Sequence, residues 1–343
     1  MSKYRNTIYT LFLLSICITS CLGRRESVVL KSSPVQIISD SSIFIKNPKC
    51  FKVCDSLLFL LGKGNGRLIT VLSYPSMEYV GQLCREGRGP NEFLDISCFD
   101  VVNDSLYVIP TSAQDIHIIS LNDIRNKDFD AWCIKKVNSL VPPNLSYSVT
   151  PFGVASVMAI GSRIRISGNQ IKESEYGVPY DNPRINKLYL STLWSGPVDY
   201  SVEYNTLVTA TFLGEVIEFI DLKTFERKVV VGKEGYPDLL KKGKTISVGK
   251  YDGFFDLQIV GDKLYALYSG ESRSELIESI QSGKNVESGA KSIRIYNLSG
   301  ELLESINLDT KIIGFYVDME NGFILGLSNW NNFLKFRLNT NEK

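Results

Sequence analysis

Histidine is almost absent from this chain: its 343 residues include one, His117. Structural and catalytic zinc sites draw on several imidazole or thiolate ligands, so a multi-histidine metal centre is excluded. An excess of charge of one sign is missing too, because 38 Lys and Arg residues balance 37 Asp and Glu residues. Proteins that bind nucleic acid through its phosphates carry a basic excess. We therefore expect no metal, no cofactor and no nucleic-acid partner.

Long hydrophobic runs are also lacking. The apolar stretch from Ile8 to Ile18 spans eleven residues, whereas a membrane-crossing helix needs about 20. Lys3 and Arg5 precede it, and a basic end before a short apolar stretch is typical of a secretory signal. The stretch closes with Ile18-Thr19-Ser20-Cys21, which resembles a bacterial lipobox with Ile in place of the usual Leu. The sequence predicts acylation of Cys21; plain secretion with an incidental cysteine is the alternative.

These features predict a location in the cell envelope. Residues 1–20 are expected to be a lipoprotein signal peptide, residues 21–32 a lipidated tether, and residues 33–343 the folded domain. Acyl chains on Cys21 would be the contact with the membrane. Arg24 and Arg25 follow the cysteine where an acidic run would favour the cell surface, so we expect an outer-membrane lipoprotein that faces the periplasm.

Disulfide bonds are not predicted. Once Cys17 and Cys21 are set aside, an odd number of cysteines remains: Cys50, Cys54, Cys84, Cys98 and Cys133. Cys50 and Cys54 would lie about 13 Å apart in an extended strand, and a disulfide needs Cα atoms within about 7 Å. We expect buried free thiols.

The sequence does contain an internal repeat with a period near 50 residues. An apolar segment that suits a strand recurs as ITVLSY from Ile69, IHIISL from Ile116, IEFIDL from Ile217 and IRIYNL from Ile293. A turn-and-strand segment also recurs, as DSLLFL from Asp55, DSLYVI from Asp104, NTLVTA from Asn205, DKLYAL from Asp262 and NGFILG from Asn321. Several short strands per period predict the blades of a β-propeller.

Six blades are expected, at about 50–95, 96–145, 146–200, 201–245, 250–309 and 311–338. The last one is short of an outer strand, and the segment from Val28 to Ile45 is rich in strand-forming residues. Completion of this blade by the N-terminal segment would remove an open sheet edge. The expected fold is all-β, a six-bladed propeller closed by an N-terminal strand; five or seven blades are the alternatives.

The chain resembles the TolB-like six-bladed propeller lipoproteins of anaerobic Gram-negative bacteria. The resemblance rests on GRGPNEF from Gly87 to Phe93, on KLYALYSG from Lys263 to Gly270, and on IEFIDL and IRIYNL with the turns after them. It covers most of the mature chain. These motifs imply the fold, and the family has no settled activity that could be carried over.

Candidate binding residues lie in loops that should gather on one face, namely the connections between blades and the loops between second and third strands. Two of these loops are long, 167–184 and 269–291, and long loops on a rigid scaffold often carry function. A tolerated surface insertion is the alternative. The candidates are Arg88, Asn91, Glu92, Tyr176, Tyr180, Asp181, Arg184 and Arg273.

Two functions follow from this reading. The first is a non-catalytic, lipid-anchored propeller that binds a partner protein or an envelope glycan, because the chain lacks an enzyme motif. The second is a propeller enzyme that processes glycosides or lactones with carboxylates around the central channel. Asp100, Asp252 and Asp256 lie near the predicted inner strands and are the acids that this second function would use.

Overall fold

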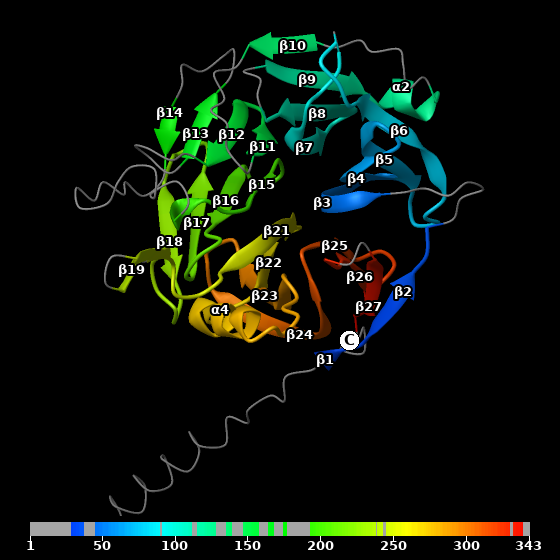
Figure 1. The fold of residues 1–343 in the computed structure, drawn as a ribbon. Helices are drawn as coiled ribbons and strands as arrows, with labels where there is room; N and C mark the ends of the chain where they lie inside the picture. Colours follow the sequence, from blue (N-terminus) through cyan, green and yellow to red (C-terminus); the bar gives the residue numbers. More distant parts are fainter. Residues whose placement is uncertain are drawn as a thin grey trace, which may run out of the picture.

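The computed structural model describes residues 29–37, 45–89, 91–111, 115–127, 135–138, 147–157, 164–167, 174–176, 193–237, 239–242, 245–329 and 332–338. Six sheets stand around one axis, as Figure 1 shows in a view along it. The chain is therefore the predicted all-β, six-bladed propeller. Within the described ranges, no helix combines the length and the apolar character needed to cross a membrane.

Each blade is a sheet whose first strand lies nearest the axis. Blade 1 comprises β3 (Lys46–Cys54), β4 (Leu57–Gly64), β5 (Arg67–Ser73) and β6 (Tyr79–Arg85). Blade 2 comprises β7 (Ile96–Val102), β8 (Ser105–Pro110), β9 (Asp115–Ser120) and β10 (Lys135–Asn138), and α2 (Leu121–Arg125) follows β9. Blade 3 comprises β11 (Tyr147–Thr150), β12 (Gly153–Val157), β13 (Ile164–Ser167) and β14 (Ser174–Tyr176).

The second half of the ring repeats this plan. Blade 4 comprises β15 (Val198–Ser201), β16 (Thr206–Ala210), β17 (Val216–Asp221) and β18 (Arg227–Val231). Blade 5 comprises β21 (Phe254–Val260), β22 (Lys263–Tyr268), β23 (Ala290–Asn297) and β24 (Leu302–Ile312), with α4 (Arg273–Gln281) between its second and third strands. Blade 6 comprises β25 (Gly314–Asp318), β26 (Phe323–Leu327) and β27 (Phe333–Arg337).

The N-terminal segment closes the ring, as predicted. The strand β2 (Ser32–Val35) pairs antiparallel with β27, so that Val35 lies opposite Phe333, and it supplies the outer strand of blade 6. Just before it, β1 (Val29–Leu30) pairs in parallel with β24 of blade 5. The strand β2, near the start of the described chain, and β27, its last described strand, thus lie side by side in the ring (Figure 1), and β27 is not left with an open edge.

The recurring Asp, Asn or Gly before each second strand has a backbone cause. Asp55, Asn103, Asn205 and Gly261 adopt φ values of 50°, 47°, 50° and 57°. Short hairpin turns require this left-handed conformation, and these residue types tolerate it best. The turn motif therefore marks the hairpin between the first and second strands of blades 1, 2, 4 and 5.

Apolar side chains fill the space between neighbouring blades. Phe51 of blade 1 meets Phe333 of blade 6 edge to face, with ring centroids 5.2 Å apart. Phe59 of blade 1 and Phe99 of blade 2 pack in a similar way at 6.4 Å. Because the blades pack against each other around a closed ring, each loop is held at a fixed place on one of the two faces.

Two of the predicted blade boundaries were wrong. The strand β15 belongs to blade 4 and not to the end of blade 3. Residues 239–248 contain a separate hairpin of β19 (Leu239–Lys242) and β20 (Thr245–Val248), which lies between blades 4 and 5 in the sequence and joins no blade sheet.

The cysteines that the structure describes are free, as predicted for Cys50 and Cys54. Burial raises the pKa of the Cys50 thiol to about 12, which keeps it protonated and unreactive at neutral pH. Cys21 and Cys133 lie outside the described residues.

Candidate functional site

The two faces of the propeller differ in what they carry. Strands alternate in direction within each blade, so the hairpins between first and second strands lie on one face, here called the turn face. Loops between second and third strands and the connections between blades lie on the other, here called the insertion face. The innermost strands surround a cavity of about 200 Å³ between these faces.

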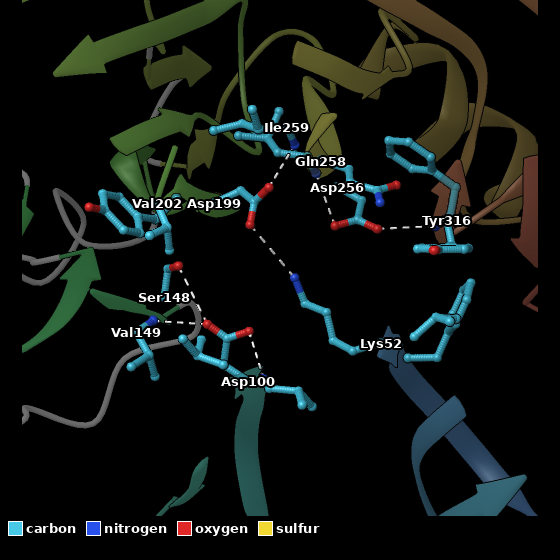
Figure 2. A pocket seen from close by; sticks show the side chains of 17 residues that line it. Lys52, Asp100, Ser148, Val149, Asp199, Val202, Asp256, Gln258, Ile259 and Tyr316 are labelled. Atoms are coloured by element: carbon cyan, nitrogen blue, oxygen red, sulfur yellow. Dashed lines mark hydrogen bonds and ion pairs between the residues drawn. The ribbon is translucent and has the colours of Figure 1, made fainter. Parts of the chain in front are cut away.

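The wall of this cavity is polar at its centre. Figure 2 shows Lys52 of β3 extending between Asp100 of β7, Asp199 of β15 and Asp256 of β21. The four side chains come from four different blades. In blade 6 the first residue of the inner strand is Gly314, where a Cβ would meet only Asp256 and Phe51 within 4 Å.

Each carboxylate also joins its blade to the next one. Asp100 accepts a hydrogen bond of 2.8 Å from the Val149 backbone N–H, and Asp199 accepts one of 2.7 Å from that of Ile259. Asp256 accepts one of 3.0 Å from Phe315. In every case the donor belongs to the innermost strand of the following blade. These bonds satisfy backbone groups that curved inner strands leave unpaired toward the channel.

Lys52 is the cation of this wall. Its Nζ lies 3.9 Å from Asp199 Oδ1, and its side chain is 37% exposed to the channel. Burial alone would lower the pKa of Lys52, but Asp199, Asp100 and Asp256 together raise it, so the ammonium stays charged at any physiological pH. Burial raises the pKa of Asp199, and Lys52 opposes this shift.

Asp256 gives the channel a testable pH dependence. Burial raises the pKa of its carboxyl from 3.8 to about 6, although Lys52 and two backbone N–H groups oppose the shift. The folded state then holds this proton more tightly than the unfolded state, so stability is lost as the pH rises through this window. Between about pH 4 and pH 7 we expect Asp256 to reduce the free energy of unfolding by up to about 3 kcal/mol.

Urea unfolding of the wild type and of Asp256→Asn across this pH range measures the effect. The difference in stability between the two proteins should move in favour of the variant as the pH increases. A difference that stays constant from pH 4 to pH 7 would show that Asp256 has the same pKa in both states.

Two of the three acids named from the sequence line the channel, Asp100 and Asp256; the third, Asp252, does not. Asp252 precedes β21 on the insertion face and pairs with Arg273. Sequence reasoning missed Lys52 and Asp199. Over the part of the chain that the structure describes, no three His, Cys, Asp or Glu side chains lie close enough together to hold one metal ion.

The insertion face carries one large feature, the helix α4. It lies in the predicted long loop 269–291, between the second and third strands of blade 5. No residue of α4 is buried, and Ile277 and Ile280 are 44% and 61% exposed. The helix therefore adds no apolar core to the blade.

The base of α4 is fixed to the ring. Arg273 pairs with Asp252 at 3.1 Å, and Lys311 reaches Glu271 at 2.6 Å. Ser272 forms a β-bridge with Tyr251. Arg273, a candidate ligand residue from the sequence, thus has a partner within the chain.

A buried ion pair holds the loops beneath α4. Glu215, in the loop before β17, pairs with Arg294 of β23 and accepts a hydrogen bond of 3.1 Å from the Tyr268 hydroxyl. The Arg294 guanidinium lies 3.7 Å from the centre of the Tyr268 ring, a cation–π contact. Blades 4 and 5 are joined at this point of the insertion face.

The GRGPNEF segment lies on the same face, between blades 1 and 2. Arg88, Asn91 and Glu92 are exposed there, which is where a binding residue should lie. Glu92 Oε2 also accepts a hydrogen bond of 2.7 Å from the Gly89 backbone N–H, and a Cβ on Gly87 would lie only 2.0 Å from the same oxygen. A side chain at position 87 would therefore displace the exposed Glu92 carboxylate from this position.

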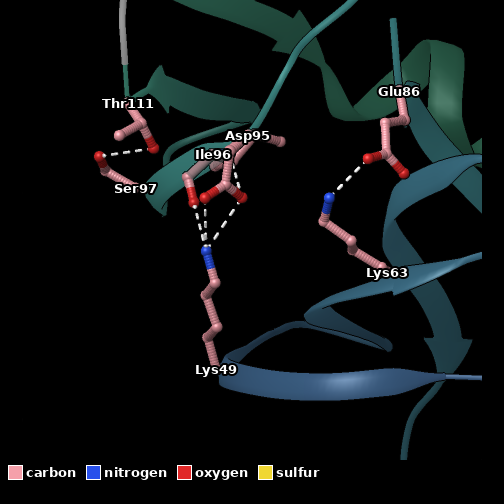
Figure 3. A network of polar contacts seen from close by, with 7 residues as sticks. All are labelled: Lys49, Lys63, Glu86, Asp95, Ile96, Ser97 and Thr111. Carbon is pink, nitrogen blue, oxygen red and sulfur yellow. Dashed lines mark hydrogen bonds and ion pairs between the residues drawn. The ribbon is translucent and has the colours of Figure 1, made fainter.

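Two exposed ion pairs flank this segment. Figure 3 shows Lys49 reaching Asp95 at 2.9 Å and Lys63 reaching Glu86 at 2.5 Å, each pair joining blade 1 to the connection toward blade 2. All four side chains are more than a third exposed to solvent. Pairs of this kind contribute at most about 1 kcal/mol to stability.

The other long loop is divided by the structure. Residues 167–184 were expected to form one loop on the insertion face, but Ser174–Tyr176 is the outer strand β14 of blade 3. Tyr176 ends that strand. Tyr180, Asp181 and Arg184 lie outside the described residues. The ligand-binding role of this group stays a prediction.

The ring of six blades agrees with a family comparison. The sequence profile described as TolB-like 6-blade propeller-like matches residues 29–320. The chain belongs to this TolB-like family. No curated protein matches it significantly.

Three solved structures share the fold of this TolB-like propeller. A member of the DUF4221 family from Bacteroides vulgatus is 11% identical, with a TM-score of 0.52, and the match covers 91% of this chain and 96% of that one. A Bacteroides fragilis protein described as exported is 12% identical, with a TM-score of 0.50 and coverage of 91% and 96%. The WD40 repeats of RRP9 are 9% identical, with a TM-score of 0.51 and coverage of 91% and 100%. At these identities the likeness concerns the fold.

Proposed function

We propose that this TolB-like propeller is a lipid-anchored protein of the cell envelope that binds a partner protein through its insertion face and catalyses no reaction. The predicted leader before Cys21 supports the location, as does the similar fold of the Bacteroides fragilis protein described as exported. The observation that carries the binding role is the helix α4.

An exposed helix of nine residues is marginally stable alone, so the ring must hold it in place. The pairs at Asp252 and Lys311 do so. Ile277 and Ile280 lie three positions apart and therefore on one side of the helix. A helix that presents two exposed aliphatic residues fits an apolar groove on another protein. An envelope glycan offers hydroxyl groups to such a surface and is the less suited ligand.

The enzyme alternative would use the channel carboxylates. Asp100 and Asp256 each accept two backbone N–H bonds, one from within their own strand and one from the next blade. Carboxylates bound in this way support the ring. Their positions favour a structural role over proton transfer to a substrate.

The lipid anchor has a direct test. Radiolabelled palmitate should mark the native protein in growing cells and leave a Cys21→Ala variant unlabelled, because a thioether and an amide on the mature N-terminal cysteine carry the acyl chains. Cell fractionation must show that the Cys21→Ala variant is exported, because only then are the two proteins comparable. Equal labelling of both proteins would refute acylation at Cys21.

The binding role is tested by shortening the insertion. Replacement of residues 274–286 by a Gly-Ser turn keeps Arg273 and the Lys311 contacts. Because this segment buries no helix side chain, we expect the melting temperature to change little, corresponding to less than about 1 kcal/mol. A protein that co-purifies with the intact chain should no longer co-purify with the shortened chain.

A matched control separates the helix from apolar surface in general. Ile277→Glu with Ile280→Glu should lose the partner, whereas Leu302→Glu with Leu303→Glu, on the outer strand of the same blade, should keep it. Leu302 and Leu303 are 49% and 47% exposed. Retention of the partner by the shortened chain would refute the role of α4, and binding to purified envelope glycan instead would favour the glycan ligand.

A further inference from the structure

The central channel holds a charge imbalance that its own residues do not resolve. Asp100, Asp199 and Asp256 face it, and Lys52 is the single Lys or Arg among the residues that line the cavity. A cavity with an excess of carboxylates attracts positive charge. A purely anionic ligand would be repelled by these three carboxylates.

Lys52 has unused hydrogen-bonding capacity. The Asp199 Oδ1 atom lies 3.9 Å from its Nζ, beyond hydrogen-bond distance, and no described residue accepts a hydrogen bond from it. An ammonium carries three N–H donors and no acceptor. Figure 2 shows this group directed into the open centre of the cavity. A simple amine bound here would offer these donors no acceptor.

The cavity is small and reaches the turn face. Its volume of about 200 Å³ is below the 300–1,000 Å³ that is usual for drug-sized ligands. The lining extends to Val202, which is 61% exposed in the turn after β15. It includes no residue from the loops that carry α4 or GRGPNEF. A ligand in the channel therefore enters from the face opposite the proposed partner site.

We propose that the channel binds a small amino-carboxylate zwitterion, whose ammonium lies among Asp100, Asp199 and Asp256 and whose carboxylate accepts hydrogen bonds from Lys52. Such a molecule supplies the missing positive charge and the missing acceptor together. A neutral polyol of the same size supplies only the acceptor. This site is independent of the insertion face.

A ligand series on the unmodified protein is the first test. Calorimetric titration compares glycine, β-alanine and γ-aminobutyrate with propylamine, which lacks the carboxylate, and with propionate, which lacks the amine. We expect at least one of the zwitterions to bind with a Kd below about 1 mM, and propylamine to bind roughly tenfold more weakly or worse. Propionate should not bind.

Variants then assign the contacts. Lys52→Met should reduce the affinity for the best zwitterion roughly tenfold to hundredfold, because the carboxylate loses its partner, and should not weaken propylamine binding, because a like charge is removed from beside the ammonium. Asp199→Asn should weaken the binding of both. Glu86→Gln, in an exposed pair, is the control.

The outcomes decide the proposal. Binding of a zwitterion with the expected order of ligands supports it, and unfolding curves establish that each variant is folded. Absence of binding by all three zwitterions at about 10 mM overturns it. Equal affinity for propionate also overturns it.

Discussion

Replacement of Glu215 by alanine is expected to lower the free energy of unfolding by about 3–5 kcal/mol. The Glu215 side chain is 8% exposed and that of its partner Arg294 is 21% exposed, so the pair is largely removed from water. The carboxylate also accepts hydrogen bonds of 3.1 Å from the Tyr268 hydroxyl and from the Glu234 backbone N–H. Its loss leaves the Arg294 charge without a carboxylate partner between blades 4 and 5.

A matched variant makes this prediction specific. Glu86→Ala removes the carboxylate of the Lys63 pair in Figure 3, whose side chains are 47% and 37% exposed. Solvent and salt screen such pairs, so we expect a much smaller loss of stability than for Glu215→Ala. Guanidinium unfolding of both variants gives the comparison. Equal small losses would show that the Glu215 network does not hold the two blades together.

Removal of residues 29–37 is expected to prevent stable folding. This segment contributes β2 to blade 6 and β1 to the edge of blade 5. Leu30 is 6% exposed, and the Ser32 backbone N–H donates to both oxygens of Asp309 at 3.1 Å. Without the segment, β27 presents an unpaired edge to other chains. We expect the truncated chain to aggregate and to lack a cooperative melting transition.

A permuted chain tests whether the strand or only the chain length matters. Ser32 lies opposite Phe336, so the end of β27 lies beside the start of β2. A chain that begins at residue 45 and carries residues 31–37 after Leu338 through a short Gly-Ser turn would form this hairpin directly. It should melt cooperatively, at a temperature below that of the wild type because it lacks β1 and the buried Leu30 side chain. A soluble, cooperatively melting truncated chain would refute closure by the N-terminal strand.

Much of the fold is predictable from the sequence, for reasons that particular residues show. The turn motif fixes the start of each second strand, because Asp55 and Asn205 take up the left-handed conformation that their side chains favour. The third-strand motifs IEFIDL and IRIYNL both lie in β-strands at the expected place. The alternation of apolar and polar residues and the choice of turn residues are local features of the sequence, so they can be recognised strand by strand.

The candidate site is only half predictable. Asp100 and Asp256 could be identified from the sequence because the inner strands that contain them are long enough to be recognised. Asp199 lies in β15, a four-residue strand without a clear alternating pattern, and Lys52 follows two residues after Cys50 in a strand with a register shift. Whether side chains from different blades lie at the same height in the channel depends on how each inner strand is placed relative to its neighbours in the ring. One sequence does not contain that information.

Arg273 illustrates a second limit. Its place in a long loop made it a candidate ligand residue, and the loop does form the exposed helix on the insertion face. The sequence could not show that Asp252, 21 positions earlier, pairs with it and turns it into a support for the helix. A contact such as this one depends on how the segment before β21 and the segment after β22 are placed relative to each other in space.

The claim that α4 is the docking element is tested most directly by photo-crosslinking in living cells. A photoreactive residue is placed at Ile277 and, as a control of similar exposure on the turn face, at Phe225; the two side chains are 44% and 43% exposed. We predict that position 277 crosslinks to one discrete envelope protein and that position 225 does not. Crosslinking of that protein at position 225 and not at position 277 would contradict a binding role for α4.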